Sequence, residues 1–113
     1  MIIRTAVTVF LALSFAVPAQ AASFDCEKPD LAADEKAICE NRALNDADVK
    51  MVTTFDLLSG LLAMGARGSM QDAQIEWLKR RQACGTDTAC LRLAYEERTK
   101  DLMDIYNEMP RPF

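Results

Sequence analysis

The segment Gln74–Cys90, QIEWLKRRQACGTDTAC, gathers the residues of this 113-residue chain whose types and spacing could do chemistry. Cys84 and Cys90 could bind a metal ion, act as a redox pair or form a structural disulfide. The basic run Lys79-Arg80-Arg81 could contact nucleic acid. These alternatives require different spacings between the cysteines and different cellular compartments. The N-terminus of the chain indicates the compartment.

The first residues have the features of a cleavable export signal. Arg4 supplies a positive start, residues 6–17 form an apolar run, and Ala19-Gln20-Ala21 has the small-x-small form that signal peptidase recognises. We therefore predict a signal peptide over residues 1–21 and a periplasmic or secreted protein. A membrane anchor would need about 20 apolar residues. No cysteine directly follows the run to carry a lipid, so we expect no membrane anchor after cleavage.

The predicted mature chain is small and acidic. It begins at Ala22, and the loss of Arg4 leaves 12 basic residues (13 − 1) against 17 acidic ones, so that the net formal charge changes from −4 to −5. We expect one domain over residues 22–107 and a flexible C-terminal tail over residues 108–113. The negative charge disfavours nucleic acid as a partner and favours a basic protein.

Helix signals without alternating strand patterns predict an all-α bundle of about four helices. Asp30 can cap a first helix that ends near Asn41. A second helix follows over residues 44–62, with Asn45 or Asp46 as its cap, because apolar residues recur there at spacings of three or four. The expected inward face of this second helix consists of Leu44, Ala47, Met51, Phe55, Leu58 and Leu62.

Glycines predict a bend after the second helix. Gly60, Gly65 and Gly68 each weaken a helix by about 1 kcal/mol relative to alanine. We therefore expect a loop within residues 63–69 and a third helix that is capped by Ser69.

The third helix is expected to end near Cys84, since Gly85 then takes the usual position just past a helix end. A fourth helix begins at Asp87 or Thr88 and stops before Pro110, which has no N–H to donate. The expected inward residues of these two helices are Ala73, Trp77, Leu78, Leu91, Ala94, Tyr95, Leu102 and Ile105.

The four cysteines allow three pairings. Gly85 and the cap signals after it break the helix between Cys84 and Cys90, so these two cysteines can flank a tight reversal and be joined. That pairing leaves Cys26 with Cys39. Pairing over long range, such as Cys26 with Cys84, stays open. Disulfide rings of this size stabilise a small domain by roughly 2–3 kcal/mol each.

A metal, redox or catalytic role fits the residues less well. The chain has no histidine, the five-residue gap between Cys84 and Cys90 is not a zinc-knuckle spacing, and redox pairs more typically have two residues between their cysteines. Without a histidine base or a free thiol, nucleophilic catalysis has no support, and the adjacent Glu96 and Glu97 diverge on a helix. We expect a non-enzymatic protein without a metal ion or cofactor.

The basic run is interpreted as a solvated surface. Three consecutive helical positions span about 200°, so the run does not share one face. Arg81 follows Trp77 by one helical turn, and we expect it to turn inward, over the indole or toward a carboxylate.

The segments FDCEK, DEKAIC, QIEWLKRRQAC and CLRLAYEERTKDL together resemble the LprI-like lysozyme inhibitor family of small exported bacterial proteins. The resemblance covers roughly residues 24–102. This chain departs from the family pattern in its Gly- and Met-rich middle segment and in Phe55, where tyrosine is common. The matching positions are Cys26, Glu35, Lys36, Ile38, Cys39, Leu44, Asp48, Gln74, Trp77, Leu78, Arg81, Cys84, Cys90, Tyr95 and Arg98.

The resemblance implies a compact four-helix fold with two disulfides and an activity that inhibits lysozyme and so protects the cell wall. Lysozymes are commonly basic, which suits an acidic partner. The segments most suited to occlude an enzyme cleft are the turn over residues 84–90 and the expected loop over residues 60–69. We expect Glu35, Asp48, Trp77, Arg81, Tyr95 and Arg98 mostly to build the fold. The alternative is an envelope structural or stress-response module that binds another periplasmic protein.

Overall fold

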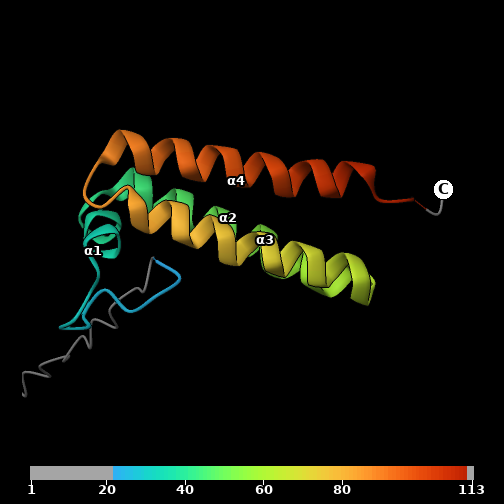
Figure 1. The fold of residues 1–113 in the computed structure, drawn as a ribbon, viewed down its shortest axis with the longest axis horizontal. Helices are drawn as coiled ribbons and strands as arrows, with labels where there is room; N and C mark the ends of the chain where they lie inside the picture. Colours follow the sequence, from blue (N-terminus) through green and yellow to red (C-terminus); the bar gives the residue numbers. More distant parts are fainter. Residues whose placement is uncertain (1–21, 112–113) are drawn as a thin grey trace, which may run out of the picture.

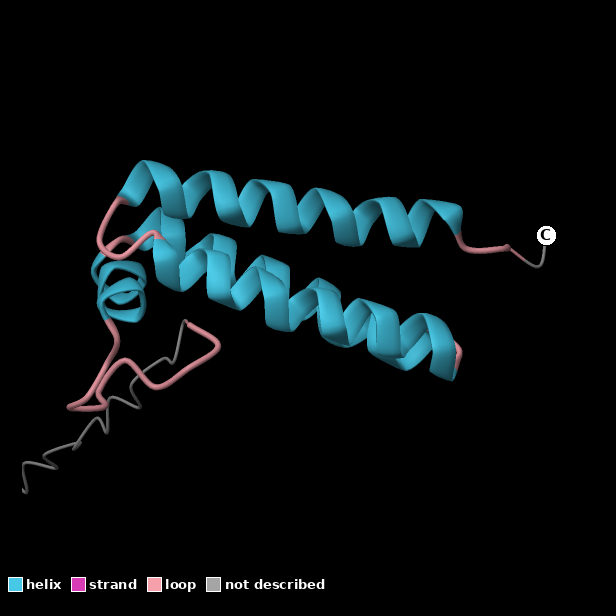
Figure 2. Cartoon of the chain, viewed as in Figure 1, coloured by secondary structure: helices cyan, strands magenta, loops and turns pink. Residues whose placement is uncertain are grey.

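The computed structural model describes residues 22–111 (Figure 1), so the expected signal peptide and residues 112–113 of the expected tail lie outside the described residues. The described part contains four α-helices: α1 over Ala33–Glu40, α2 over Arg42–Leu61, α3 over Met64–Ala83 and α4 over Thr88–Glu108. Figure 2 shows only helices and loops in this range. The expected all-α class with four helices is confirmed. Helix α4 extends one residue beyond the expected domain end at residue 107.

Helix α1 begins later than the sequence predicts. Its N-cap is Ala32, whose backbone N–H donates to Oε1 of Glu35 at 3.1 Å. The expected cap at Asp30 is wrong, because Asp30 lies in a turn of the segment before the helix, residues 22–31, which we call the lead-in. The reach of the Glu35 carboxylate back to the first free N–H fixes the start of the helix.

Helix α2 begins earlier than predicted. Asn41 caps it by accepting the backbone N–H of Leu44 at 3.2 Å, and Asn41 also ends α1. The expected caps Asn45 and Asp46 are wrong, since both lie inside the helix. The expected inward face is correct: Leu44, Met51 and Leu58 are buried, and Ala47, Phe55 and Leu62 pack partly buried against the same core.

The connection between α2 and α3 is a two-residue turn, Leu62 and Ala63, and the predicted loop over residues 63–69 is wrong. Helix α3 starts at Met64 and passes through two glycines and Ser69, which is not a cap. Arg67 supports the turn by donating from Nη2 to the carbonyl oxygen of Leu62 at 3.0 Å. Burial of apolar residues farther along both helices outweighs the low helix propensity of the glycines.

The junction of α3 and α4 follows the prediction. Gly85 has φ of 55°, the left-handed region that glycine tolerates best. Asp87 caps α4 through a hydrogen bond from the backbone N–H of Cys90 at 3.1 Å.

The prediction of an inward Ala73 is wrong, because this residue is exposed. The buried face of α3 instead follows Met70, Trp77 and Arg81.

The hydrophobic core runs between the three long helices. Helices α2 and α4 pack most closely along the bundle, while α1 lies across one end and contacts α2 and α3 (Figure 1). The fully buried core residues are Ile38, Leu44, Met51, Leu58, Met70, Trp77, Leu91, Tyr95 and Leu102.

Both expected disulfides are present. Cys26–Cys39 ties the lead-in to α1 with a Cα–Cα distance of 5.8 Å, and Cys84–Cys90 closes the turn between α3 and α4 with 5.5 Å. The lead-in, α1 and this turn share one end of the bundle, and the α2–α3 turn lies at the other (Figure 1). We refer to residues 22–40 and 84–90 as the disulfide end, and to the α2–α3 turn with the last turn of α4 as the open end.

Candidate functional site

Each of the four helices contributes one side chain to a buried polar cluster at the disulfide end. Arg81 of α3 donates from Nε to Oδ2 of Asp34 on α1 at 2.8 Å. The hydroxyl of Tyr95 on α4 donates to Oδ1 of Asp48 on α2 at 2.7 Å. Nη1 of Arg81 links the two pairs, at 3.5 Å from the Tyr95 oxygen and 3.9 Å from Oδ1 of Asp48. All four residues are buried.

The protonation of this cluster follows from its burial and its charges. Burial raises the pKa of the Tyr95 phenol far above its ordinary value, and the neighbouring Asp48 carboxylate raises it further. Burial alone would lower the pKa of Arg81, but its interactions with Tyr95 and Asp34 outweigh that effect, and the pKa of Arg81 is raised. Tyr95 therefore remains a neutral donor and Arg81 a cation.

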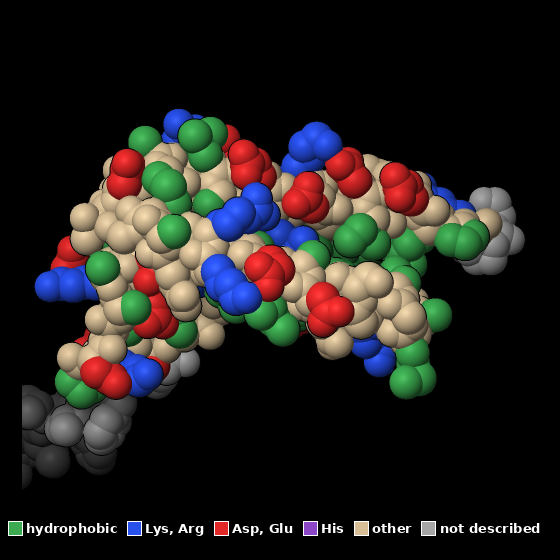
Figure 3. Space-filling view, viewed as in Figure 1, with side chains coloured by type: hydrophobic (Ala, Val, Ile, Leu, Met, Phe, Trp, Pro, Cys, Tyr) green, Lys and Arg blue, Asp and Glu red, His purple; other side chains and the backbone are tan. Residues whose placement is uncertain are grey.

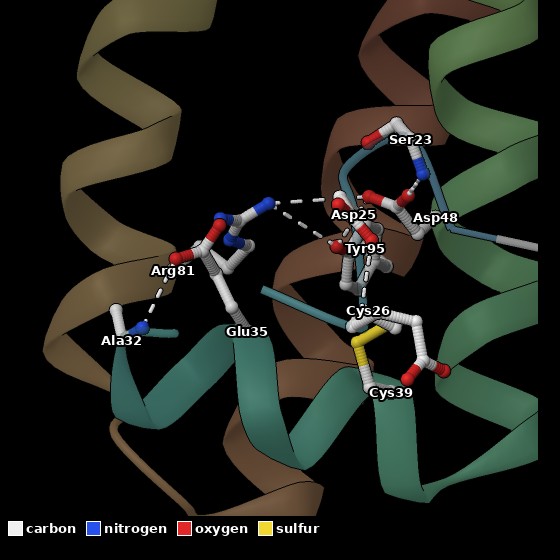
Figure 4. Close-up of a disulfide and its surroundings, with 10 residues drawn as sticks. Ser23, Asp25, Cys26, Ala32, Glu35, Cys39, Asp48, Arg81 and Tyr95 are labelled. Atoms are coloured by element: carbon white, nitrogen blue, oxygen red, sulfur yellow. Dashed lines mark hydrogen bonds and ion pairs between the residues drawn. A yellow bond between two sulfur atoms is a disulfide. The ribbon is translucent and has the colours of Figure 1, made fainter. Parts of the chain in front are cut away.

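The lead-in covers the cluster from outside the bundle. The backbone N–H of Ser23 donates to Oδ2 of Asp48 at 2.7 Å, and the guanidinium carbon of Arg81 lies 5.5 Å from the centroid of the Phe24 ring. Figure 4 shows Ser23, Asp48, Tyr95 and Arg81 grouped beside the Cys26–Cys39 bridge. This disulfide therefore holds the segment that seals the cluster.

Trp77 packs against Tyr95 and Arg81 of the cluster and is fully buried. Its Nε1–H donates to the carbonyl oxygen of Ala94 at 2.8 Å, so the one polar atom of the indole is satisfied. Its ring meets that of Tyr95 edge-on at 5.1 Å, and its centroid is 5.8 Å from the guanidinium carbon of Arg81. Both expected contacts of Arg81, with the indole and with a carboxylate, are present.

A second polar group lies nearer the open end. Arg98 of α4 donates from Nε to Gln74 at 2.7 Å and from Nη2 to the carbonyl oxygen of Met70 at 3.1 Å, both on α3. Gln74 in turn contacts the sulfur of Met51 on α2 at 3.5 Å. Burial lowers the pKa of Arg98, the nearby Arg80 lowers it further, and Asp101 opposes the change.

The structure brings most of the expected motif residues together as internal contacts. Asp48, Trp77, Arg81, Tyr95 and Arg98 connect helices in the interior. Glu35 is the exception, since it caps α1 at the surface. The sequence does not predict the contact that Asp34 makes, because its partner Arg81 is 47 positions away and no local pattern marks the pair.

This cluster can hold the four helices rigidly together, but its side chains are buried. The surface of the described residues has several grooves, and two of them lie along the long helices. One, of about 500 Å³, runs between α2 and α4 beside Lys50, Arg92 and Glu96. The other, of about 430 Å³, is mostly apolar and lies between α3 and the end of α4, beside Met70, Ile105 and Met109.

The two ends of the bundle differ in surface character. Residues 22–40 hold six acidic residues and two basic ones, a net charge of −4 (2 − 6). At the open end Leu57, Leu61 and Met64 are 65%, 60% and 85% exposed. Figure 3 shows hydrophobic side chains on the visible face where the ends of α3 and α4 diverge.

Within residues 22–111, no group of three or more acidic or cysteine side chains is arranged to hold a metal ion. None of the helices in this range combines the length and the apolar character needed to cross a bilayer. No protein-family model, curated protein or solved structure matches this chain.

Proposed function

We propose that this chain is an exported, non-enzymatic binding protein that inhibits a basic lysozyme by occluding its cleft. The observation that carries the proposal is the charge of the disulfide end, where residues 22–40 contribute −4 (2 − 6). A charge of this sign increases the rate at which a basic enzyme associates, and the increase falls as salt screens it. The resemblance to the LprI-like family supports the choice of lysozyme.

The rigidity of the disulfide end supports its assignment as the inhibitory surface. A protein that occludes a cleft gains affinity when its contact surface is ordered before binding. Two disulfides, the Asp87 cap and the buried cluster fix the lead-in, α1 and the turn over residues 84–90. Of the two segments expected to occlude a cleft, the turn over residues 84–90 is retained, while residues 60–69 form helix ends rather than a projecting loop.

A lysis assay with two charge-reversed variants tests this assignment. Both variants change the same number of exposed acidic residues to lysine, so their net charges are equal. The first carries Glu27→Lys, Asp30→Lys and Glu40→Lys at the disulfide end, and the second carries Asp56→Lys, Asp72→Lys and Glu108→Lys elsewhere.

We expect the first variant to need a concentration higher by on the order of tenfold for half inhibition, and the second to stay closer to the unchanged protein. Equal losses would contradict the location of the binding surface. If the oxidised protein inhibits none of several lysozymes at micromolar concentration, the lysozyme proposal fails.

The open end favours a second candidate function. Leu57, Leu61 and Met64 are exposed, and an apolar groove lies between the start of α3 and the end of α4; both features suit contact with another protein of the cell envelope. A structural or stress-response module would use this surface and leave lysozyme unaffected. The same lysis assay separates the two functions.

A further inference from the structure

The buried cluster contains one more carboxylate than cation. Within residues 22–111, Arg81 is the only cation within 4.0 Å of either Asp34 or Asp48. Arg81 lies closer to Asp34, at 2.8 Å, than to Asp48, at 3.9 Å. The other donors to Asp48, the Tyr95 hydroxyl and the Ser23 N–H, are neutral. An uncompensated buried carboxylate is costly, so Asp48 lies where a second cation would stabilise the fold.

The start of the predicted mature chain lies next to this carboxylate. The backbone nitrogen of Ser23 is 2.7 Å from Oδ2 of Asp48. Three covalent bonds separate it from the nitrogen of Ala22, so the two nitrogens are no more than about 4 Å apart. The Ala22 nitrogen is therefore within about 7 Å of Oδ2. Each carboxylate oxygen can accept more than one hydrogen bond, so Oδ2 retains capacity for a further donor.

We propose that cleavage after Ala21 creates an α-ammonium group on Ala22 that pairs with Asp48 and balances the charge of the cluster. Hydrolysis breaks the C–N bond between Ala21 and Ala22, adds the hydroxyl of water to the Ala21 carbonyl carbon and returns a proton to the nitrogen. The freed amine takes up a second proton below its pKa. Two carboxylates then face two cations. The inference rests on the export that is part of the proposed function.

This pairing makes removal of the signal peptide a step in stabilising the fold. Before cleavage the nitrogen of Ala22 is a neutral amide, and the one cation near Asp48 among the described residues is Arg81, 3.9 Å away. After cleavage the new charge fixes the lead-in at its first residue, while the Cys26–Cys39 bridge fixes it four positions later. The lead-in that covers the cluster is then held at both ends.

The charges around the amine determine the sign of its pKa change. Asp48 of α2 and Asp34 of α1 favour the ammonium form, Arg81 of α3 opposes it, and Tyr95 of α4 is neutral. With two carboxylates against one cation, the proposed pairing should raise the pKa of the amine. A raised pKa stabilises the fold below the ordinary amine pKa, and this contribution is lost as the pH rises through the folded value.

The test uses the full chain, exported by a bacterial host and recovered from the periplasm. Mass spectrometry identifies the first residue, and NMR titration of the amine gives its pKa. The matched variant has two glycines inserted between Ala21 and Ala22, which displaces the new amine by up to about 7 Å without changing any side chain. The same insertion in an Asp48→Asn background is the control.

We expect Ala22 as the first residue, an amine pKa above its ordinary range, and an ordinary pKa in the insertion variant. The insertion should raise the unfolding equilibrium constant at least about fivefold, and much less in the Asp48→Asn background. If that background does not fold, the two amine pKa values alone decide. Correct cleavage with an ordinary amine pKa overturns the pairing and leaves export intact, whereas a chain recovered with residues 1–21 attached overturns both. Neither outcome depends on lysozyme binding.

Discussion

At the scale of single residues, the contacts of Arg81 explain why a basic run contains one inward arginine. Lys79 and Arg80 are exposed, whereas Arg81 points at Asp34 and lies near the rings of Phe24 and Trp77. A guanidinium suits this position because it offers several donors in one plane and packs well near aromatic rings. The run therefore consists of two exposed basic residues followed by one buried arginine that connects helices.

Removal of the Arg81 side chain should destabilise the fold strongly. Arg81→Ala leaves the buried Asp34 carboxylate without its cation and removes the positive charge 3.9 Å from Asp48. We expect a loss of about 3–5 kcal/mol in the free energy of unfolding, measured by urea titration. Arg80→Ala is the control, since Arg80 is 59% exposed and 3.7 Å from Glu97, and it should change stability by less than about 1 kcal/mol. Similar small losses for both variants would show that the cluster contributes little to the fold.

Tyr95 should make the protein sensitive to alkaline pH. Its pKa in the fold is raised from the ordinary 10.0, mainly by burial and then by Asp48, so above that pH only the unfolded chain ionises this phenol. Stability should be unaffected by this group below about pH 9 and fall by up to about 1.4 kcal/mol per pH unit above 10. Urea titrations across this range should show a shallower dependence in Tyr95→Phe and an unchanged one in Tyr106→Phe, whose tyrosine is exposed. Equal slopes in all three proteins would contradict the burial of a neutral Tyr95.

At the scale of helices, the sequence predicts which segments are helical better than it predicts where each helix begins and ends. Asp87 and Gly85 lie where two local signals agree, and the end of α3 and the start of α4 follow the prediction. Asn41 was not predicted as a cap, because Asn45 and Asp46 offer the same local signal and only the packing of α1 against α2 decides among them. Gly65 and Gly68 predict a loop, but they lie inside α3 because the burial of apolar residues farther along this helix determines where it begins.

Two glycine substitutions distinguish a helical glycine from a turn glycine. Gly68 lies inside α3, and a Cβ there would meet nothing within 4 Å, so Gly68→Ala should stabilise the protein by about 0.5–1 kcal/mol. Gly85 has φ of 55°, so Gly85→Ala should cost about 1–2 kcal/mol even though the space is open. Thermal unfolding of both variants checks this. Destabilisation by Gly68→Ala would favour the loop that the sequence alone predicts.

At the scale of the whole molecule, the sequence predicts the fold class, both disulfides and most of the core, but not the buried polar cluster at the disulfide end. The pairs Asp34–Arg81 and Asp48–Tyr95 each join residues 47 positions apart, so no periodic pattern connects them. The contact of Ser23 with Asp48 likewise depends on how the lead-in folds back over the bundle. The acidic character of residues 22–40 is visible in the sequence, but their position at the end of the bundle opposite the α2–α3 turn follows only from the assembled fold.

We propose that two disulfides, formed after export, fix the acidic end as a rigid surface for binding. Peptide mapping of the protein under non-reducing conditions, after recovery from the periplasm of an exporting host, tests it most directly. We expect linked peptides for Cys26–Cys39 and Cys84–Cys90 and no free thiol. Reduced cysteines, or peptides linked in another pairing, would contradict it.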